Sequence, residues 1–221
     1  MKPKIVLVIT DQETNAQIAK LGVDFLELRV DLFKKAGVAH ALRQFQIRRA
    51  LKVRLLLTVR DQKKEGALKP MATARKWELL RALMPLTDWV DIELSSPLRA
   101  KAIALARRLK KKVVISMHDF KRVPPNLGGL LKKALKGRAD IIKIAVHANS
   151  QDDLMRMAVF TRDNRKHPLA TMCLGPWGGL SRLVLPVTGS RWIYTFLRKP
   201  TAPGQVDIKT LKSQLKFLPN W

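Results

Sequence analysis

The chain has 221 residues, 47% of them hydrophobic, and its 43 Lys and Arg outnumber its 17 Asp and Glu, so the formal net charge is +26. This length can bury the core of one large α/β domain, and the hydrophobic fraction excludes an intrinsically disordered chain. One cysteine excludes an internal disulfide, and without a signal peptide or an apolar run of roughly 20 residues the sequence predicts a soluble protein of the reducing cytoplasm.

Eight apolar, β-branched segments recur along the chain and are predicted to be strands. In chain order they are Lys4–Thr10, Phe25–Asp31, Arg54–Arg60, Trp89–Ser95, Lys112–His118, Ile141–His147, Pro168–Leu174 and Trp192–Leu197. Between them, helical periodicity is clearest in Ala72–Leu86 and Leu98–Leu109 and weaker in Leu130–Leu135 and Leu154–Phe160. Eight strand-then-helix units without a linker predict a (β/α)8 TIM barrel, a single catalytic domain over residues 1–221. A doubly wound open sheet is the competing architecture.

Polar side chains gather in five of these strands, mostly toward their carboxyl ends. They are Glu27, Arg29 and Asp31 in the second strand, Arg60 in the third, Asp91, Glu93 and Ser95 in the fourth, Ser116 and His118 in the fifth, and Lys143 in the sixth. Alternating residues of a strand share one face, so in a barrel these groups would meet in the lumen near its C-terminal mouth. That mouth is the expected place of a functional site.

Lys143 lies within the apolar run Ile141–Val146, and this is the most informative position in the chain. Lysine is almost never fully buried without a reason, and burial disfavours its charged form. A desolvated amine is the usual nucleophile for a Schiff base with a carbonyl substrate. In so basic a chain a lysine can also fall in a strand by chance, so the run alone leaves both interpretations open.

At the level of motifs the chain resembles the type I 3-dehydroquinate dehydratases, from about Lys4 to Ile208. The segments that carry the resemblance are Glu27–Asp31, Thr58–Arg60 with Glu65-Gly66, Val90–Glu93, Ile115–Phe120, Ile142–Ala145, Met172, Gly179–Arg182 and Ala202–Gln205. Two departures are visible. Arg60 and Glu65 enclose one more residue than expected, and Thr201 stands where the family often has serine.

The resemblance implies a hydro-lyase of the shikimate pathway, which serves aromatic amino acid biosynthesis. It would convert 3-dehydroquinate into 3-dehydroshikimate and water. Lys143 would form the imine, His118 would be the general acid and base, and Glu65 would orient the histidine. Substrate binding would fall to Glu27, Arg29, Arg60, Arg182, Thr201, Gln205 and Met172. No metal or cofactor is implied, since the imine replaces a Lewis acid, and family members commonly form homodimers.

Each of these residues alone also fits a structural role. His118 could be a satisfied histidine at a strand end, and Glu27 with Arg29 could be an ion pair inside the barrel. Two other functions stay open as well. One is a class I aldolase acting on a phosphorylated sugar, with a phosphate site near Gly175–Gly179. The other is a non-catalytic basic barrel that binds anions or RNA, although the scattered basic residues predict only non-specific binding of nucleic acid.

Overall fold

The strands of the computed structural model form one parallel, nearly closed barrel. Residues 2–35 and 37–218 are described, and within them eight strands pair in the order β7-β6-β5-β4-β3-β2-β1-β8. Their bounds are β1 Lys4–Ile9, β2 Phe25–Arg29, β3 Arg54–Thr58, β4 Trp89–Glu93, β5 Lys112–Asp119, β6 Ile141–His147, β7 Leu169–Leu174 and β8 Trp192–Phe196. The predicted (β/α)8 barrel is therefore confirmed, and the open sheet is not the architecture.

The barrel is completed between β7 and β8 by Ser190. The Ser190 hydroxyl accepts a hydrogen bond from the Thr171 amide at 2.9 Å and lies 3.2 Å from the Thr171 carbonyl oxygen. Just beyond it, the Arg191 amide donates to the Leu169 carbonyl at 2.7 Å. The Ser190 side chain thus takes the place of backbone hydrogen bonds that would otherwise join β7 to β8. Buried backbone groups need a partner, and here the serine supplies it.

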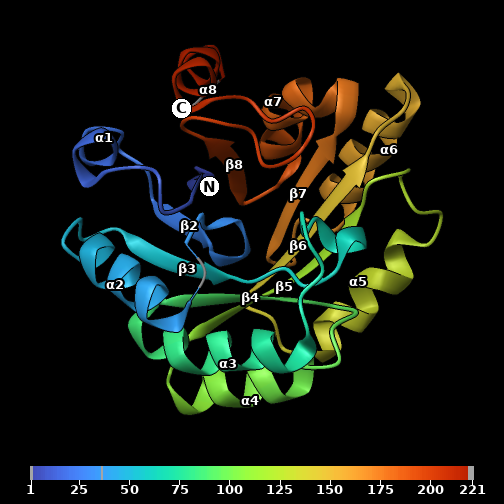
Figure 1. The fold of residues 1–221 in the computed structure, drawn as a ribbon. Coiled ribbons are helices and arrows are strands. Elements are labelled where there is room, and N and C mark those ends of the chain that lie inside the picture. The colour runs from blue at the N-terminus through green and yellow to red at the C-terminus, as the bar shows by residue number, and fades with distance from the viewer. Residues whose placement is uncertain (1, 36, 219–221) are drawn as a thin grey trace.

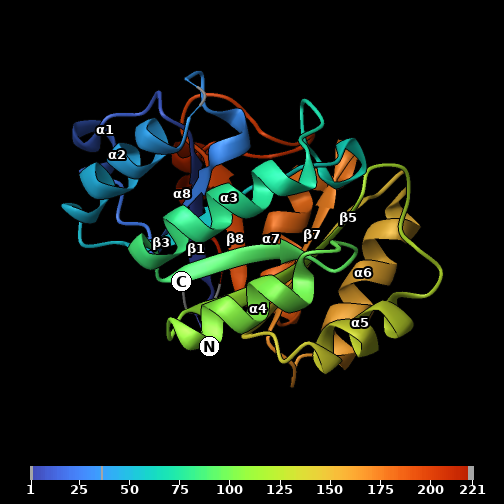
Figure 2. The ribbon, with the colours of Figure 1, turned by 60° about the horizontal axis from the view of Figure 1, so that its bottom comes forward.

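Helices surround the barrel and cover its outer face (Figures 1 and 2). Within the described residues they are α1 Asn15–Ala19, α2 Val38–Arg49, α3 Thr73–Leu83, α4 Arg99–Arg108, α5 Leu127–Lys136, α6 Gln151–Asp163, α7 Gly178–Thr188 and α8 Ile208–Leu215. Short 3-10 turns lie at η1 Val30–Leu32, η2 Lys63–Glu65, η3 Met84–Leu86 and η4 Gly175–Trp177. No helix in residues 2–35 and 37–218 has both the length and the apolar character needed to cross a membrane.

The predicted strands begin within one residue of the observed ones, and most of them end too late. Strand β2 stops at Arg29 because Val30–Leu32 turns into η1, and β3 and β4 stop two residues before the predicted ends. The predicted helix Ala72–Leu86 is α3 followed by η3, since Pro85 has no amide hydrogen for a helical bond. Helices α1, α2, α7 and α8 were not predicted. In α7 the helical signal in the sequence is weakened by Gly178, Gly179 and an internal Pro186, which are poor helix formers.

Two apolar layers position the site. The larger layer lies between the outer face of the strands and the helices. The smaller one fills the lower lumen, where Phe25, Trp89 and Trp192 pack with ring centroids 4.5 to 5.6 Å apart. These aromatic rings plug the amino-terminal half of the barrel. The lumen is therefore a dead-end pocket that opens at the carboxyl ends of the strands.

Candidate active site

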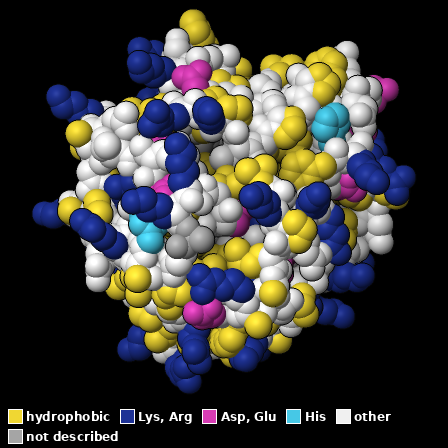
Figure 3. Space-filling model, in the orientation of Figure 1, with side chains coloured by type: hydrophobic (Ala, Val, Ile, Leu, Met, Phe, Trp, Pro, Cys, Tyr) yellow, Lys and Arg dark blue, Asp and Glu magenta, His cyan; other side chains and the backbone are white. Residues whose placement is uncertain are grey.

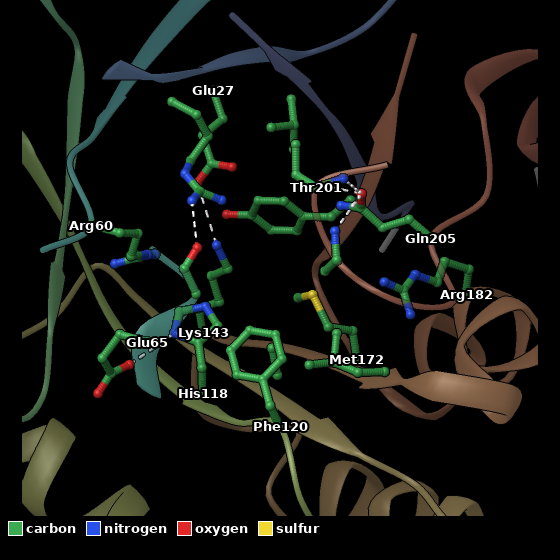
Figure 4. A pocket seen from close by; sticks show the side chains of 17 residues that line it. Glu27, Arg60, Glu65, His118, Phe120, Lys143, Met172, Arg182, Thr201 and Gln205 are labelled. Carbon is green, nitrogen blue, oxygen red and sulfur yellow. Dashed lines mark hydrogen bonds and ion pairs between the residues drawn. The ribbon is translucent and has the colours of Figure 1, made fainter. Parts of the chain in front are cut away.

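One pocket at the C-terminal mouth is lined by all ten predicted site residues (Figure 4). They are Glu27, Arg29, Arg60, Glu65, His118, Lys143, Met172, Arg182, Thr201 and Gln205. Figure 4 shows Arg60, Glu65 and His118 on one side and Met172, Arg182 and Gln205 on the other, with Lys143 near His118. The alternation of β2, β5, β6 and β7 therefore brings together side chains that are far apart in the sequence.

Lys143 projects from the middle of β6 into this pocket, and its side chain is 7% exposed. Its Nζ lies 3.3 Å from Glu27 Oε1 and 3.5 Å from Asp91 Oδ2. The nitrogen also stands 4.2 Å from the centre of the Tyr194 ring. Glu27 is fixed in turn by the Thr58 hydroxyl, which donates to Oε1 at 2.8 Å. The amine is thus held at one point by groups from β2, β4 and β8, and Thr58 of β3 supports the first of them.

A chain of alternating charges runs from the lysine into the barrel wall. Arg60 donates to both oxygens of Asp91, at 2.8 and 2.7 Å, and to Glu93 at 2.9 Å. Lys76, which enters from α3, pairs with Glu93 and lies 3.0 Å from Asp61. These five side chains are at most 4% exposed. Buried charges persist only when paired and hydrogen bonded, and here each one is.

The electrostatics of this network fix its protonation. Burial alone would raise the pKa of Asp91, but Arg60 and Lys143 outweigh it and hold that pKa below its ordinary value. Burial likewise disfavours the Arg60 cation, whereas Asp91 and Glu93 raise its pKa well above the ordinary value. Asp91 therefore stays a carboxylate beside the lysine. Arg60 is held by the carboxylates of Asp91 and Glu93, and it also lines the pocket.

His118 lies at the carboxyl end of β5 and is oriented by a carboxylate. Its Nδ1 is 3.0 Å from Glu65 Oε2, and Ser95 donates to the other Glu65 oxygen at 2.6 Å. Burial, followed by the positive charges of Arg60 and Lys143, lowers the pKa of His118 well below its ordinary 6.5. Burial also raises the pKa of Glu65, against the Ser95 hydrogen bond. The imidazole is accordingly neutral at neutral pH, the form that accepts a proton.

The loop that carries Glu65 is held by Arg29. Its guanidinium binds both oxygens of Asp31, at 3.0 and 2.7 Å, and donates to the Gly66 carbonyl at 2.9 Å. Gly66 has φ +89°, a conformation that favours glycine, and a Cβ there would come within 3.0 Å of the Phe120 ring. Despite the unexpected spacing from Arg60, the structure places Glu65 against His118.

The opposite wall contains a buried guanidinium without an acidic partner. Arg182, at the start of α7, is 2% exposed, and its Nη1 donates to the carbonyls of Cys173 and Gly178 and contacts Ser181 Oγ. Its Nε and Nη2 have no hydrogen-bond partner among the described residues. Burial lowers the pKa of Arg182 to about 10, so it is still a cation at pH 7. This free edge is shaped for a carboxylate, which arginine binds through two parallel bonds.

Thr201 and Gln205 belong to the loop after β8. The Gln205 Oε1 atom accepts from the Thr201 amide at 2.6 Å, from the Thr201 hydroxyl at 3.2 Å and from the Ala202 amide at 3.3 Å. The amide oxygen thus shapes the loop. Met172, 5% exposed on β7, gives the pocket an apolar side.

Three residues of the site were missed by sequence reasoning. Tyr194 and Phe120 line the pocket, and Lys76 anchors its ion network. Strand alternation could have found Tyr194, which is two residues beyond the inward-facing Trp192, and Phe120 stands two residues after His118. No sequence signal marks Lys76, because it lies on a helix outside the barrel. Nowhere in residues 2–35 and 37–218 do three or more His, Cys, Asp or Glu form a group able to hold a metal ion.

Comparisons with known proteins agree with this geometry. A family model described as type I 3-dehydroquinase matches residues 5–220. A 3-dehydroquinate dehydratase from Hydrogenobaculum sp. is 32% identical over 212 residues, which cover 94% of this chain and 95% of the relative. The chain therefore belongs to the type I 3-dehydroquinase family.

Solved structures support the same relationship. The 3-dehydroquinate dehydratase from Aquifex aeolicus has a TM-score of 0.86 at 30% identity and covers 99% of this chain and 100% of its own. A type I 3-dehydroquinate dehydratase from Clostridium difficile, solved with covalently modified comenic acid, has a TM-score of 0.85 at 26% identity. That match covers 97% of this chain and 91% of the other.

Replacing Lys76 by methionine is expected to destabilise the fold by about 3–5 kcal/mol, because Asp61 and Glu93 would be left buried without a cation. Urea unfolding followed by circular dichroism measures the change. The control is Arg75→Met on the same helix, whose ion pair with Glu78 is 38% exposed on the arginine side and should contribute only about 0–1 kcal/mol. Equal effects of the two variants would contradict a stabilising role of the buried network.

The lowered pKa of His118 predicts a ring that titrates below pH 6.5. The imidazole should stay neutral as the pH falls through 6.5 and take up its proton only at lower pH. Proton NMR of the ring signals, with His118→Asn to assign the resonance, measures the midpoint. Because an unfolded chain would titrate near the ordinary value first, the same shift should make the fold less stable as the pH drops below 6.5. A midpoint at or above 6.5 would contradict the burial argument.

Proposed function

We propose that this protein is a 3-dehydroquinate dehydratase that removes water from 3-dehydroquinate through an imine on Lys143. The family and the names of its relatives support the activity. The observation that carries the mechanism is the pairing of a buried amine on one wall with an unpaired, buried guanidinium on the other, in one pocket. A small keto acid offers both groups what they lack, a carbonyl carbon for Lys143 and a carboxylate for Arg182.

The ketone has to be converted into an electron sink, because a proton beside a ketone is lost slowly at neutral pH. The unprotonated Lys143 amine attacks the carbonyl carbon, and the carbinolamine takes up a proton on its hydroxyl and loses water to give a protonated imine. The Nζ atom then carries a positive charge beside Glu27 and Asp91, 3.3 and 3.5 Å away in the free enzyme. Removal of the neighbouring proton places the electron pair in an enamine instead of an unstabilised carbanion.

His118 is the proposed acid and base of the elimination. Its neutral ring can accept the proton while Glu65 holds Nδ1 and stabilises the imidazolium that forms. The same proton can pass to the departing hydroxyl, which leaves as water as the carbon–carbon double bond forms. Hydrolysis of the product imine returns the amine of Lys143. Proton transfer of this kind contributes about 10²–10⁴-fold to a rate.

The remaining predicted residues are proposed to hold the substrate. Arg182 binds the carboxylate, with Gln205 and Thr201 closing over it from the loop after β8. Glu27, Arg29 and Arg60 face the hydroxyls from the charged wall, and Met172 packs on the ring. Arg29 and Arg60 act with their carboxylate partners in place, so they present fixed donors that need no reorganisation when substrate binds.

The geometry gives less support to the two other functions. A sugar-phosphate aldolase would use the glycine-rich segment after β7 as a phosphate cradle. In this protein the segment packs against the next loop: the Gly175 amide donates to the Pro203 carbonyl, and a Cβ on Gly178 would stand 2.5 Å from Gly204. A non-catalytic anion-binding barrel does not require the oriented pair of His118 and Glu65 inside the lumen.

The exposed surface suits an anionic substrate. Around the pocket mouth the loops expose Lys34, Lys35, Lys63, Lys64, Lys69, Lys121, Arg122, Arg198 and Lys199. On the face shown in Figure 3, basic side chains greatly outnumber acidic ones. Such a field steers anions toward a pocket at low salt and also attracts polyanions without specificity. We place the enzyme in the cytoplasm and regard residues 1–221 as its catalytic domain.

Borohydride reduction in the presence of 3-dehydroquinate tests the proposal directly. The imine should be trapped as a secondary amine on Lys143, located by peptide mass mapping, and Lys143→Ala should lose both the adduct and turnover. Lys112→Ala is the matched control, because Lys112 begins β5 at the opposite end of the barrel and is 61% exposed. An adduct on another lysine, or turnover retained by Lys143→Ala, would refute the mechanism.

Arg182→Ala is expected to raise the Michaelis constant about 10–100-fold, because hydrogen bonds to a charged group are worth about 1.5–3 kcal/mol each. The Michaelis constant of Arg182→Lys should lie between those of Arg182→Ala and wild type, since lysine keeps the charge and loses the bidentate edge. Arg162→Ala, on a side chain 56% exposed, serves as the control. An unchanged Michaelis constant in Arg182→Ala would rule out the carboxylate clamp.

We also propose a homodimer. Exposed apolar side chains lie on the neighbouring helices α6 and α7, Met155 and Val159 on the first and Leu180 and Val187 on the second. Light scattering in about 0.15 M salt, where the Debye length of about 8 Å screens repulsion between basic copies, should report twice the mass of one chain. Val187→Glu should shift the distribution toward the monomer. A monomer's mass for the wild type at working concentration would contradict the dimer.

A further inference from the structure

Tyr194 occupies a position in the pocket that the proposed mechanism leaves unused. It is the single tyrosine of the chain, lies on β8 and is 2% exposed. Trp192, two residues earlier on the same inward face, belongs to the aromatic plug, whereas Tyr194 stands one layer higher and lines the pocket. It is therefore placed among the charged groups of the site.

The face of the Tyr194 ring lies against the reactive nitrogen. Lys143 Nζ is 4.2 Å from the ring centre, within the range in which a cation is attracted to the negative face of an aromatic ring. The attraction is strongest when both groups are desolvated, and both are buried here. The ring thus stabilises positive charge on this nitrogen.

This stabilisation persists when the imine forms. The free ammonium has three N–H donors for Glu27 and Asp91, whereas a protonated imine has one. Directional hydrogen bonds are therefore lost at the step in which the nitrogen must stay cationic. A ring quadrupole acts on the charge itself and needs no N–H, so its contribution remains.

The hydroxyl of Tyr194 has no hydrogen-bond partner among the described residues, although it is buried. Burial, with the negative charges of Glu27 and Asp91, raises the pKa of Tyr194 well above its ordinary value, so the O–H stays protonated. A buried tyrosine hydroxyl normally finds a partner. Because it belongs to a residue that lines the pocket, a bound molecule can supply that partner.

We propose that Tyr194 is a further residue of the active site, with its ring stabilising the cationic nitrogen of Lys143 and its hydroxyl hydrogen bonding to an oxygen of the bound substrate. The proposal rests on the imine mechanism given above. It divides into two parts that two substitutions separate. Tyr194→Phe removes only the hydroxyl, and Tyr194→Leu removes the ring as well.

The experiment compares steady-state kinetics with the rate of borohydride trapping at saturating 3-dehydroquinate. Tyr194→Phe should raise the Michaelis constant about 3–10-fold, as expected for one hydrogen bond between neutral groups, and should keep the wild-type trapping rate. Tyr194→Leu should in addition lower the trapping rate about 5–30-fold, because the cation loses the ring. Retention of trapping by Tyr194→Phe and its loss in Tyr194→Leu distinguish charge stabilisation from simple packing.

Ile193→Val is the matched control, since it alters a buried side chain on the same strand that packs in the outer apolar layer and does not line the pocket. It should leave both quantities within about twofold of wild type. Circular dichroism and thermal midpoints verify that every variant is folded.

Each failure has a different meaning. A wild-type Michaelis constant in Tyr194→Phe would overturn the role of the hydroxyl, and wild-type trapping in Tyr194→Leu would overturn the role of the ring. If Ile193→Val reproduced both changes, Tyr194 would be a packing residue only. Absence of any adduct on wild-type Lys143 would refute the imine mechanism itself, and the role of Tyr194 with it.

Discussion

The site depends on the cost of keeping a lysine inside an apolar barrel. Removing an ammonium from water costs several kcal/mol unless opposite charges and hydrogen bonds replace the solvent. Glu27 and Asp91 do this for Lys143, and each carboxylate then needs partners of its own, Thr58 for the first and Arg60 for the second. Arg60 pairs in turn with Glu93, and Glu93 pairs with Lys76 on α3, where the series of ion pairs ends. One buried amine is thus accompanied by polar residues of several strands and one helix.

The two walls of the pocket differ in a way that explains how it could recognise a substrate. On the wall from β2 to β6 the charged side chains already have partners. Its cations and carboxylates bind one another and hold His118 and Lys143 in fixed positions. On the wall from β7 and β8 the Arg182 edge and the Tyr194 hydroxyl are without partners in the described structure. Unsatisfied buried groups are costly, and a ligand that satisfies them recovers that cost as binding energy.

The extreme net charge and the chemistry of the site are largely separate matters. Several of the few acidic residues, including Glu27, Asp61, Glu65, Asp91 and Glu93, are buried at the pocket, which leaves the exterior even more basic than the composition indicates. Within the network these five acids outnumber the three cations Arg60, Lys76 and Lys143. The surplus of basic residues therefore lies mostly in solvent, where salt screens it and where it affects encounter with anions more than the reaction.

The sequence by itself determined the barrel and the strand starts, and its resemblance to the family supplied the ten residues that were expected at the mouth. Apolar periodicity reports burial, and the motifs from Glu27 to Gln205 resemble those of a barrel family. Helices α2 and α7 could not be predicted, because basic residues and glycines obscure the apolar face that tertiary packing supplies. Only the tertiary structure decided that Glu65 reaches His118 despite its spacing, since the Arg29 contact to Gly66 holds that loop. It alone revealed Lys76 and the ring of Tyr194 beside Lys143, because contacts between residues 15 to 51 positions apart leave no local pattern in a sequence.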